Sequence, residues 1–380
     1  MRHNTIKIIA SSLLAFTLFS GCNGDSVADA NNAKAKLGKA LFLDKNLSYN
    51  GTMACATCHD LNHAMVDSRT ASFNNGASTG ADGTSISNRN APTAAYAAFS
   101  PDFGVDEEGE YIGGEFLDGR AKDLKAQAKQ PLTNPVEMNS SIKGVVSAVK
   151  ADTTLNAQMK TIYGVEIFDD NNRAYDAIAD SIATFEETVE FAPFDSKFDR
   201  WNEGSYTFTP QEAEGKKLFE GQGQGRGEGR ARCIVCHPIN EYHPTFTDYS
   251  YDNLGVPVNT VLHGVNGVTA VDNGLGGRKD INNGLLYGAF KVATLRNIAV
   301  TGPYMHNGIF KKLKTVVHFY NTRDTGGINP ETNATWGAPE VPLTVNHTEL
   351  GNLGLSDAQE DAIVAFLKTL TDKKFEHLIP

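Results

Sequence analysis

Two five-residue stretches decide how this chain folds: Cys55-Ala56-Thr57-Cys58-His59 and Cys233-Ile234-Val235-Cys236-His237. Both follow the pattern Cys-x-x-Cys-His, the attachment signature of a c-type haem, in which two thiols form thioethers and the adjacent histidine ligates the iron. A redox dithiol or half a zinc site needs no histidine directly after the second cysteine, and the distance between the motifs suits no compact zinc site. The sequence therefore predicts two covalently bound c-type haems, with His59 and His237 as iron ligands.

The two motifs belong to an internal repeat. Gly38-Lys39-Ala40-Leu41-Phe42 precedes the first motif, and Gly215-Lys216-Lys217-Leu218-Phe219 precedes the second at nearly the same distance. The chain should therefore consist of two similar halves. Its 380 residues and 40% hydrophobic composition suffice for two domains with separate cores. We expect domains at residues 34–193 and 208–380, joined by a linker at 194–207.

Helical signals dominate the rest of the chain. An apolar face at helical spacing predicts a core-facing helix over residues 172–190. Capping boxes at Thr209–Glu212 and Ser356–Gln359 predict helices that run to about Gly221 and Leu370. The 36 glycines and 14 prolines indicate long loops, including a flexible one at 221–229, and haems would supply the apolar core that such a chain lacks. The predicted fold is mainly α, with two cytochrome c-like haem domains and long irregular loops.

The first residues indicate export. A basic start precedes the apolar run Ile8–Phe19, which is too short to span a membrane as a mature helix. Leu18–Cys22 resembles a lipoprotein cleavage site, and lipidation would explain why Cys22 is the odd one of five cysteines. We expect residues 1–22 to be a lipoprotein-type signal peptide, 23–33 a tether, and the protein to be periplasmic and anchored to the outer membrane. A plain cleaved signal peptide is the alternative.

Charge excludes one class of partner. The formal net charge is −11, and a nucleic-acid partner would need a positive patch that this composition does not provide. No other apolar stretch reaches the length of a membrane span.

The residues around both motifs resemble the bacterial di-haem cytochrome c peroxidase and MauG superfamily, from about Lys36 to Leu370. The matching stretches are LGKALFLDKNLSYNGTMACATCH (37–59), RNAPT (89–93), FLDGRAKDL (116–124), PLTNPVEM (131–138), FKVATLRN (290–297) and PYMHNGIF (303–310). The resemblance implies that hydrogen peroxide reacts at the N-terminal haem, that the C-terminal haem receives and passes electrons, and that a calcium ion lies between the domains.

Site residues follow from the same resemblance. Glu137 matches the distal acid of the peroxide site, a role that needs one group to move a proton between the peroxide oxygens; a solvated loop carboxylate is the alternative. The side chain of Asn90 and the carbonyls of Thr301 and Pro303 match the calcium site, where water would complete the ligand shell. His306 falls near the edge of the peroxide pocket, although a surface or helix-cap histidine is equally compatible.

Two departures from the peroxidase pattern concern the N-terminal haem. Residues 64–89 contain no histidine that could block its iron, so this haem should be open at rest. His63 follows His59 too closely to reach the opposite face and should be exposed. Leu117 occupies the position where the family usually has a tryptophan that relays oxidising equivalents between the haems, which puts rapid transfer between them in doubt.

A third departure concerns the C-terminal haem. Typical peroxidases use a methionine as its sixth ligand, and the matching position here is Tyr320, the residue that MauG-type enzymes use. Met305 is the other candidate ligand, and a merely packed helix aromatic is the alternative reading of Tyr320.

Three functions remain open. The first is a peroxidase that reduces hydrogen peroxide with electrons from a small cytochrome c or copper protein. The second is a MauG-like oxidase that uses peroxide to oxidise side chains of a partner protein. The third is an electron carrier without catalysis, which the open N-terminal haem argues against.

Overall fold

A computed structural model describes residues 24–70, 76–222, 231–240 and 244–380, and it is mainly helical, as predicted. The helices are α1 Gly24–Leu43, α2 Cys55–Cys58, α4 Leu124–Thr133, α5 Ile142–Ala151, α6 Thr153–Tyr163, α7 Asn171–Glu186, α8 Lys197–Asn202, α9 Pro210–Phe219, α10 Thr260–Asn266, α11 Leu313–Thr322 and α12 Asp357–Lys368. Antiparallel pairs of two-residue strands are β1 Gly104–Val105 with β2 Tyr111–Ile112, β3 Tyr251–Asp252 with β4 Phe290–Lys291, and β5 Ile328–Asn329 with β6 Ala334–Thr335. Short 3₁₀ turns and long loops connect them.

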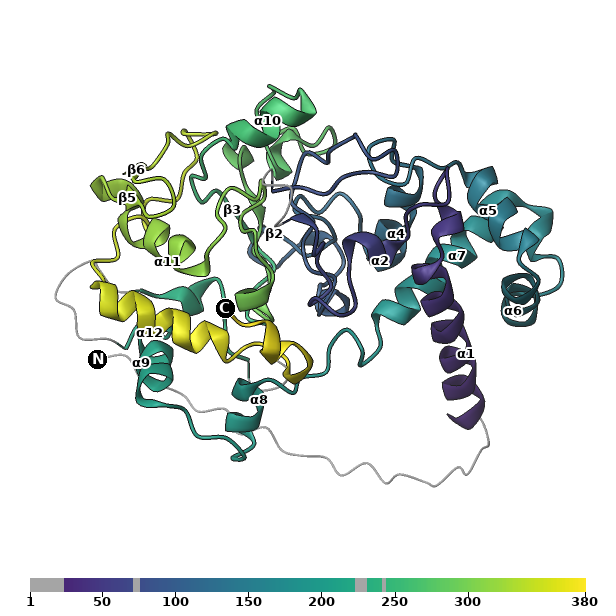
Figure 1. Ribbon diagram of the computed structural model, residues 1–380, viewed down its shortest axis with the longest axis horizontal. Helices are drawn as coiled ribbons and strands as arrows, with labels where there is room; N and C mark the ends of the chain where they lie inside the picture. Colours follow the sequence, from purple (N-terminus) through teal and green to yellow (C-terminus); the bar gives the residue numbers. More distant parts are fainter. Residues whose placement is uncertain (1–23, 71–75, 223–230, 241–243) are drawn as a thin grey trace, which may run out of the picture.

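The internal repeat appears as two equivalent helix pairs. Helix α1 packs on α7, and α9 packs on α12, toward opposite ends of the molecule (Figure 1). Each crossing depends on a glycine of the repeat. A Cβ atom on Gly38 would lie 1.9 Å from the Ser181 carbonyl oxygen, and one on Gly215 would lie 1.9 Å from the Ala362 carbonyl oxygen. Only glycine therefore permits such a close approach of the two backbones.

The aromatic cores of the two halves repeat as well. Phe42, the last residue of the first repeat, packs edge-on against Phe185 with ring centroids 5.5 Å apart. Its counterpart Phe219 packs against Phe366 at 5.2 Å. All four rings are buried. The sequence repeat thus encodes a repeated packing unit next to each Cys-x-x-Cys-His motif.

The predicted helices are confirmed, with one shorter than expected. Both capping boxes form, at Thr209 with Glu212 and at Ser356 with Gln359. Helix α7 ends at Glu186, before the predicted end at residue 190, and Val189 is consequently 75% exposed instead of lying in the core.

Two expected connecting segments are structured. Helix α1 begins at Gly24, so residues 24–33 are helical where an irregular tether was expected. The predicted linker contains α8, whose Phe198 is buried, while buried Arg296 makes two hydrogen bonds to Asp199, at 2.6 and 2.8 Å. Removing an arginine from water is compensated only by such paired contacts, so this segment is a fixed part of the second half.

Some predictions concern residues outside the described part of the chain. These are the signal peptide at 1–22 with Cys22, and most of the glycine-rich loop at 221–229. Among the helices of the described ranges, none is long and apolar enough to cross a membrane.

We expect Gly38→Ala and Gly215→Ala each to lower the free energy of unfolding by about 1–3 kcal/mol, because the added methyl group must push two helices apart. Within an isolated helix the same change would stabilise by about 1 kcal/mol, so the sign separates packing from helix propensity. Denaturant titration of the purified protein measures it. Gly284→Ala is the matched control, since a Cβ atom there meets nothing within 4 Å. Equal stability of all three variants would contradict the close-packing explanation.

Candidate functional site

Two cavities lie beside the two motifs. The first, here called the N-terminal cavity, has a volume of about 510 Å³ and is lined by Cys55, Cys58 and His59. The second, the C-terminal cavity, has a volume of about 340 Å³ and is lined by Cys233, Cys236 and His237. Each predicted haem-attachment motif therefore faces a space of its own.

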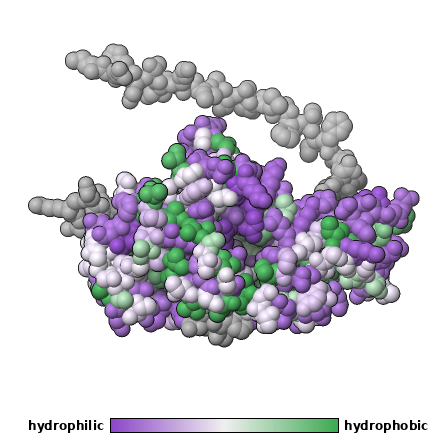
Figure 2. Space-filling view, turned by 90° about the horizontal axis from the view of Figure 1, so that it is seen from above, coloured by the Kyte–Doolittle hydropathy of each residue, from purple (hydrophilic) through white to green (hydrophobic). Residues whose placement is uncertain are grey.

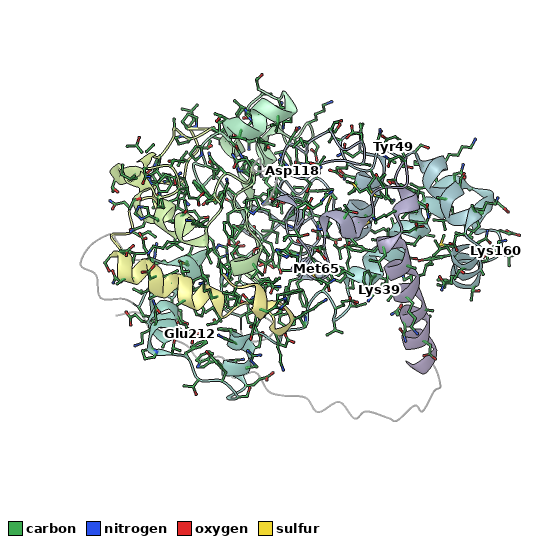
Figure 3. All side chains as sticks on the ribbon, in the orientation of Figure 1. Lys39, Tyr49, Met65, Asp118, Lys160 and Glu212 are labelled. Atoms are coloured by element: carbon green, nitrogen blue, oxygen red, sulfur yellow. The ribbon has the colours of Figure 1, made fainter. Side chains whose placement is uncertain are left out.

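Both motif histidines are oriented by a backbone carbonyl. The Nδ1 atom of His59 lies 3.1 Å from the Met65 carbonyl oxygen, and Nδ1 of His237 lies 2.7 Å from that of Phe246. A carbonyl only accepts, so Nδ1 carries the proton in each ring and Nε2 remains available as a metal ligand. Met65 and Phe246 both have φ of +54°, so the same unusual backbone turn presents the acceptor twice. Met65 is labelled near the middle of Figure 3.

The residues present fit a c-type haem in each cavity. Burial lowers the pKa of His59 and of His237, which favours the neutral imidazole that binds iron. The four motif cysteines form no disulfide. Burial raises the pKa of the Cys58 thiol to about 12, so these are protonated thiols in apolar surroundings, available for thioether formation.

Glu137 lies in the N-terminal cavity together with His59, as the resemblance implied. It sits in the loop between α4 and α5, where its carbonyl oxygen accepts a hydrogen bond from the Ala81 amide at 2.8 Å. Burial raises the pKa of its carboxyl group, although Arg120 and Asn134 oppose this effect. The carboxyl group therefore holds a proton at higher pH than an exposed glutamate does.

The C-terminal cavity contains both candidate sixth ligands. Tyr320, on α11, and Met305 line it together with His237. Burial raises the pKa of the Tyr320 hydroxyl, and no residue in the described ranges forms a hydrogen bond with this group. Tyr320 is half-buried, and its hydroxyl group belongs to a residue that lines the cavity without a protein partner in the described ranges. An iron ion in the cavity would supply that partner.

His306 lies next to Asn90, which lines both cavities and whose amide donates to the His306 carbonyl oxygen at 2.8 Å. His306 itself lines the C-terminal cavity and is absent from the wall of the N-terminal cavity, at whose edge it was expected. Its ring stacks on Phe290 at a centroid distance of 3.8 Å, and its Nε2 atom lies 3.7 Å from Glu340. These two contacts hold the buried imidazole on the side of the second motif.

The residues implied for calcium are brought together only in part. The Asn90 Nδ2 atom donates to the Pro303 carbonyl oxygen at 2.6 Å, and Thr301 lines the same cavity. Calcium needs the amide oxygen, so the Asn90 amide would have to turn to become a ligand. Within the described ranges, no three acidic, histidine or cysteine side chains are arranged to hold a metal ion. The calcium ion stays a prediction.

A thin wall separates the two cavities. Glu115, Phe116 and Leu117 line both of them. Leu117 therefore lies between the two predicted haem sites, where an aliphatic side chain offers no oxidisable group. Arg89 pairs with Asp118 and with Asp272, each at 2.7 Å, and these ion pairs connect the two halves of the chain. Asp118 is labelled in Figure 3.

Three buried or half-buried residues of the N-terminal cavity were not predicted: Glu115, Glu186 and His263. Burial raises the pKa of Glu115 to about 7 and that of Glu186 to about 8. The helical pattern of 172–190 could have indicated Glu186, since a carboxylate follows directly after core residue Phe185. His263 reaches the cavity from α10 in the second half, and no local signal identifies it. His63 is half-buried instead of exposed, and it does not line the cavity.

Comparisons with known proteins agree with this geometry. Residues 32–207 match the family of di-haem cytochrome c peroxidases. The chain is 42% identical to the methylamine utilization protein MauG of Paracoccus denitrificans, over 98% of this chain and 97% of that protein. It is 31% identical to the cytochrome c551 peroxidase of Nitrosomonas europaea, over 93% of this chain and 85% of that one.

A solved structure shows the same fold. The di-haem peroxidase BthA of Burkholderia thailandensis superposes with a TM-score of 0.80 at 29% identity, covering 91% of this chain and 88% of that chain. Two cavities with matching haem-attachment motifs, a shared fold and a full-length relative lead to one conclusion. The chain belongs to the di-haem cytochrome c peroxidase and MauG family, which implies two c-type haems and a peroxide-dependent oxidoreductase.

Proposed function

We propose that this chain is an exported MauG-like enzyme, which uses hydrogen peroxide to oxidise side chains of a partner protein. The observation that carries the proposal is the unpartnered Tyr320 hydroxyl in the cavity that contains His237. The resemblance assigns a tyrosine at this position to MauG-type enzymes and a methionine to typical peroxidases. The full-length similarity to MauG of Paracoccus denitrificans supports the same choice.

The haems, when bound, supply iron that splits peroxide at one centre and stores or passes electrons at the other. In the N-terminal cavity, Glu137 provides the proton that the departing oxygen needs. Its carboxyl group keeps this proton because burial disfavours the charged form. The hydrogen bond between Nδ1 of His59 and the Met65 carbonyl oxygen fixes the orientation of the ring, so the ring does not turn away from the cavity.

In the C-terminal cavity, Tyr320 sets the reduction potential of the haem, and with it how readily this haem accepts an electron. Burial favours the neutral phenol, so only a strong positive charge in the cavity would hold the residue as a phenolate. A phenolate is anionic and hard and stabilises ferric iron, whereas a methionine thioether is neutral and soft. A tyrosine-ligated centre would be a poor electron acceptor from a high-potential cytochrome c, and a good place to keep an oxidising equivalent.

The second candidate is a cytochrome c peroxidase that receives electrons from a small cytochrome or copper protein. Leu117 favours it, because an aliphatic side chain at this position cannot relay the oxidising equivalents that a MauG-like reaction must move between the haems. The relative in Nitrosomonas europaea supports the same alternative. A carrier without catalysis is disfavoured by an acid such as Glu137 in the open cavity.

Three further features belong to this proposal. The protein would be periplasmic and attached to the outer membrane through a lipid on Cys22. Each half, residues 34–193 and 208–380, would be a cytochrome c-like domain. A calcium ion between them would be held by Asn90, Thr301 and Pro303 with added water.

Turnover separates the two candidates. Under excess peroxide, a cytochrome c peroxidase oxidises reduced cytochrome c at a steady rate, whereas a MauG-like enzyme leaves it largely reduced and covalently changes its partner. Fast oxidation of cytochrome c or of a small copper protein would overturn the first proposal in favour of the second.

Glu137→Gln should keep both haems and lower the rate of reaction with peroxide by about 10²-fold or more, the usual scale for loss of a general acid or base. Stopped-flow absorbance measures this rate. Glu108→Gln, an exposed substitution near the β1–β2 turn, is the control and should react like the wild type. If Glu137→Gln reacts at the wild-type rate, Glu137 is a loop carboxylate without a catalytic role.

Tyr320→Met should raise the reduction potential of the C-terminal haem and shift its spectrum toward histidine–methionine ligation, because an anionic ligand is replaced by a neutral one. Spectroelectrochemical titration measures the shift, with Met305→Leu as the control. Tyr320 would be excluded as the ligand by the opposite pattern, in which Met305→Leu abolishes low-spin ligation and Tyr320→Phe does not.

A further inference from the structure

Residues 259–272 of the second half form a strap over the N-terminal cavity. Six residues of the strap contribute to the cavity wall together with His59 and Glu137: His263, Asn266, Val268, Ala270, Val271 and Asp272. In Figure 1, its helix α10 lies at the top of the molecule, next to loops of the N-terminal half. The peroxide cavity is therefore completed by residues from the other half of the chain.

Both ends of the strap are fixed. At its start, the Asn259 Nδ2 atom donates to the Asn307 carbonyl oxygen at 2.8 Å. At its end, Asp272 pairs with Arg89 and accepts two hydrogen bonds of 2.7 Å. Between them, the Asn266 amide donates to the Asn88 side chain across the two halves at 3.3 Å. The upper face, seen in Figure 2, mixes apolar and hydrophilic areas. Val261 and Val265 of α10 are half-exposed.

The strap brings one titratable side chain into the cavity. His263 lies in the last turn of α10 and is half-buried, and its backbone N–H donates to the Asn259 carbonyl oxygen at 3.0 Å. Its imidazole ring has no hydrogen bond or ion pair to any residue in the described ranges. The ring is therefore free to contact a small molecule in the cavity.

Most other charged groups of this cavity are already engaged. The charged or titratable residues that line it, the motif cysteines apart, are His59, Arg89, Glu115, Asp118, Arg120, Glu137, Glu186, His263 and Asp272. Arg89, Arg120, Asp118 and Asp272 pair with one another, Glu115 lies 3.8 Å from Lys291, and His59 is the predicted haem ligand. Glu137, Glu186 and His263 remain.

Only one of these three suits the uptake of a proton. Hydrogen peroxide must lose a proton from the oxygen that binds iron, and the other oxygen must gain one before it leaves as water. Burial raises the pKa of Glu137, and raises that of Glu186 to about 8, so burial favours the protonated, proton-donating form of both carboxyl groups. A neutral imidazole has one ring nitrogen whose lone pair can accept a proton, and the His263 ring has no hydrogen-bond partner among the described residues.

We propose that His263 is a second catalytic residue of the peroxide site, which accepts the proton of the incoming peroxide while Glu137 donates a proton to the departing oxygen. One proton would move to the His263 ring and one would leave the Glu137 carboxyl group, so that the departing oxygen leaves as water. The haem, when bound, would supply the two electrons that cleave the O–O bond and would accept the other oxygen atom. The proton on His263 then returns to Glu137, so that both groups are restored. This inference rests on the proposed reaction of peroxide in the N-terminal cavity, and not on the identity of the reductant.

Cyanide binding tests the proton acceptor without peroxide or reductant. Hydrogen cyanide is a neutral acid near pH 7 and binds ferric iron as an anion, so its proton must pass to a nearby base. His263→Leu should slow cyanide association by about tenfold or more, with little change in dissociation. His263→Gln should be equally slow, because glutamine keeps a polar side chain but accepts no proton at this pH. Stopped-flow absorbance of the ferric protein measures both rates.

His63→Leu is the matched control. It removes a half-buried histidine that is close to His59 in sequence and does not line the cavity, and it should bind cyanide at the wild-type rate. If His263→Leu loses haem, His263→Gln decides, since it preserves polarity at the strap. Wild-type association rates in both His263 variants, or in the Gln variant alone, would overturn the proposal.

Two other outcomes have separate meanings. If His263→Leu converts a low-spin N-terminal haem to high-spin and accelerates cyanide binding, His263 is a resting ligand of the iron and the proposal is wrong. If the wild-type protein binds no cyanide at all, the N-terminal iron is closed and the proposed function itself fails. Cyanide binding that is independent of His263 overturns the second catalytic residue alone.

Discussion

The orientation of each motif histidine is the constraint on which the rest of the site depends. One hydrogen bond from Nδ1 to a backbone carbonyl, of Met65 or of Phe246, fixes which nitrogen carries the proton and which remains for iron. The carbonyl is presented by a residue with positive φ, a conformation that non-glycine residues rarely adopt. The chain maintains this conformation twice, which indicates that a correctly oriented ring outweighs its cost.

The two halves share a scaffold and differ in the side chains that line their cavities. The same glycine-mediated helix crossing supports both motifs, at Gly38 and at Gly215. What each cavity then contains sets its chemistry. In the proposed function, Glu137 would give the first cavity a proton donor and Tyr320 would give the second an anionic ligand. A division of labour between two similar centres thus arises from a small number of side chains and not from a different fold.

Local signals in the sequence predicted the scaffold well. The haem motifs, the capping boxes at Thr209 and Ser356 and the repeat are all encoded within short stretches, where spacing alone determines geometry. Glu137 was located through resemblance, and it does share a cavity with His59. Contacts between residues far apart in sequence were missed. The pairing of Asp199 with Arg296 turned an expected linker into a fixed element, and no periodicity in the sequence reports such a pair.

The positions of His306 and His263 also depend on contacts between residues that are far apart in the sequence. Neither the contact between His306 and Asn90 nor the contribution of His263 to the N-terminal cavity follows from the sequence, because each depends on how the two halves meet. Electron paramagnetic resonance of the untreated ferric protein, recorded together with its near-infrared absorption, tests the central claim most directly, since the first reports the spin state of both irons and the second reports methionine ligation. The account predicts one high-spin haem, open in the N-terminal cavity, and one low-spin haem without the near-infrared thioether band, in equal amounts. Two low-spin haems, one of them with that band, would contradict both the open peroxide site and the role of Tyr320.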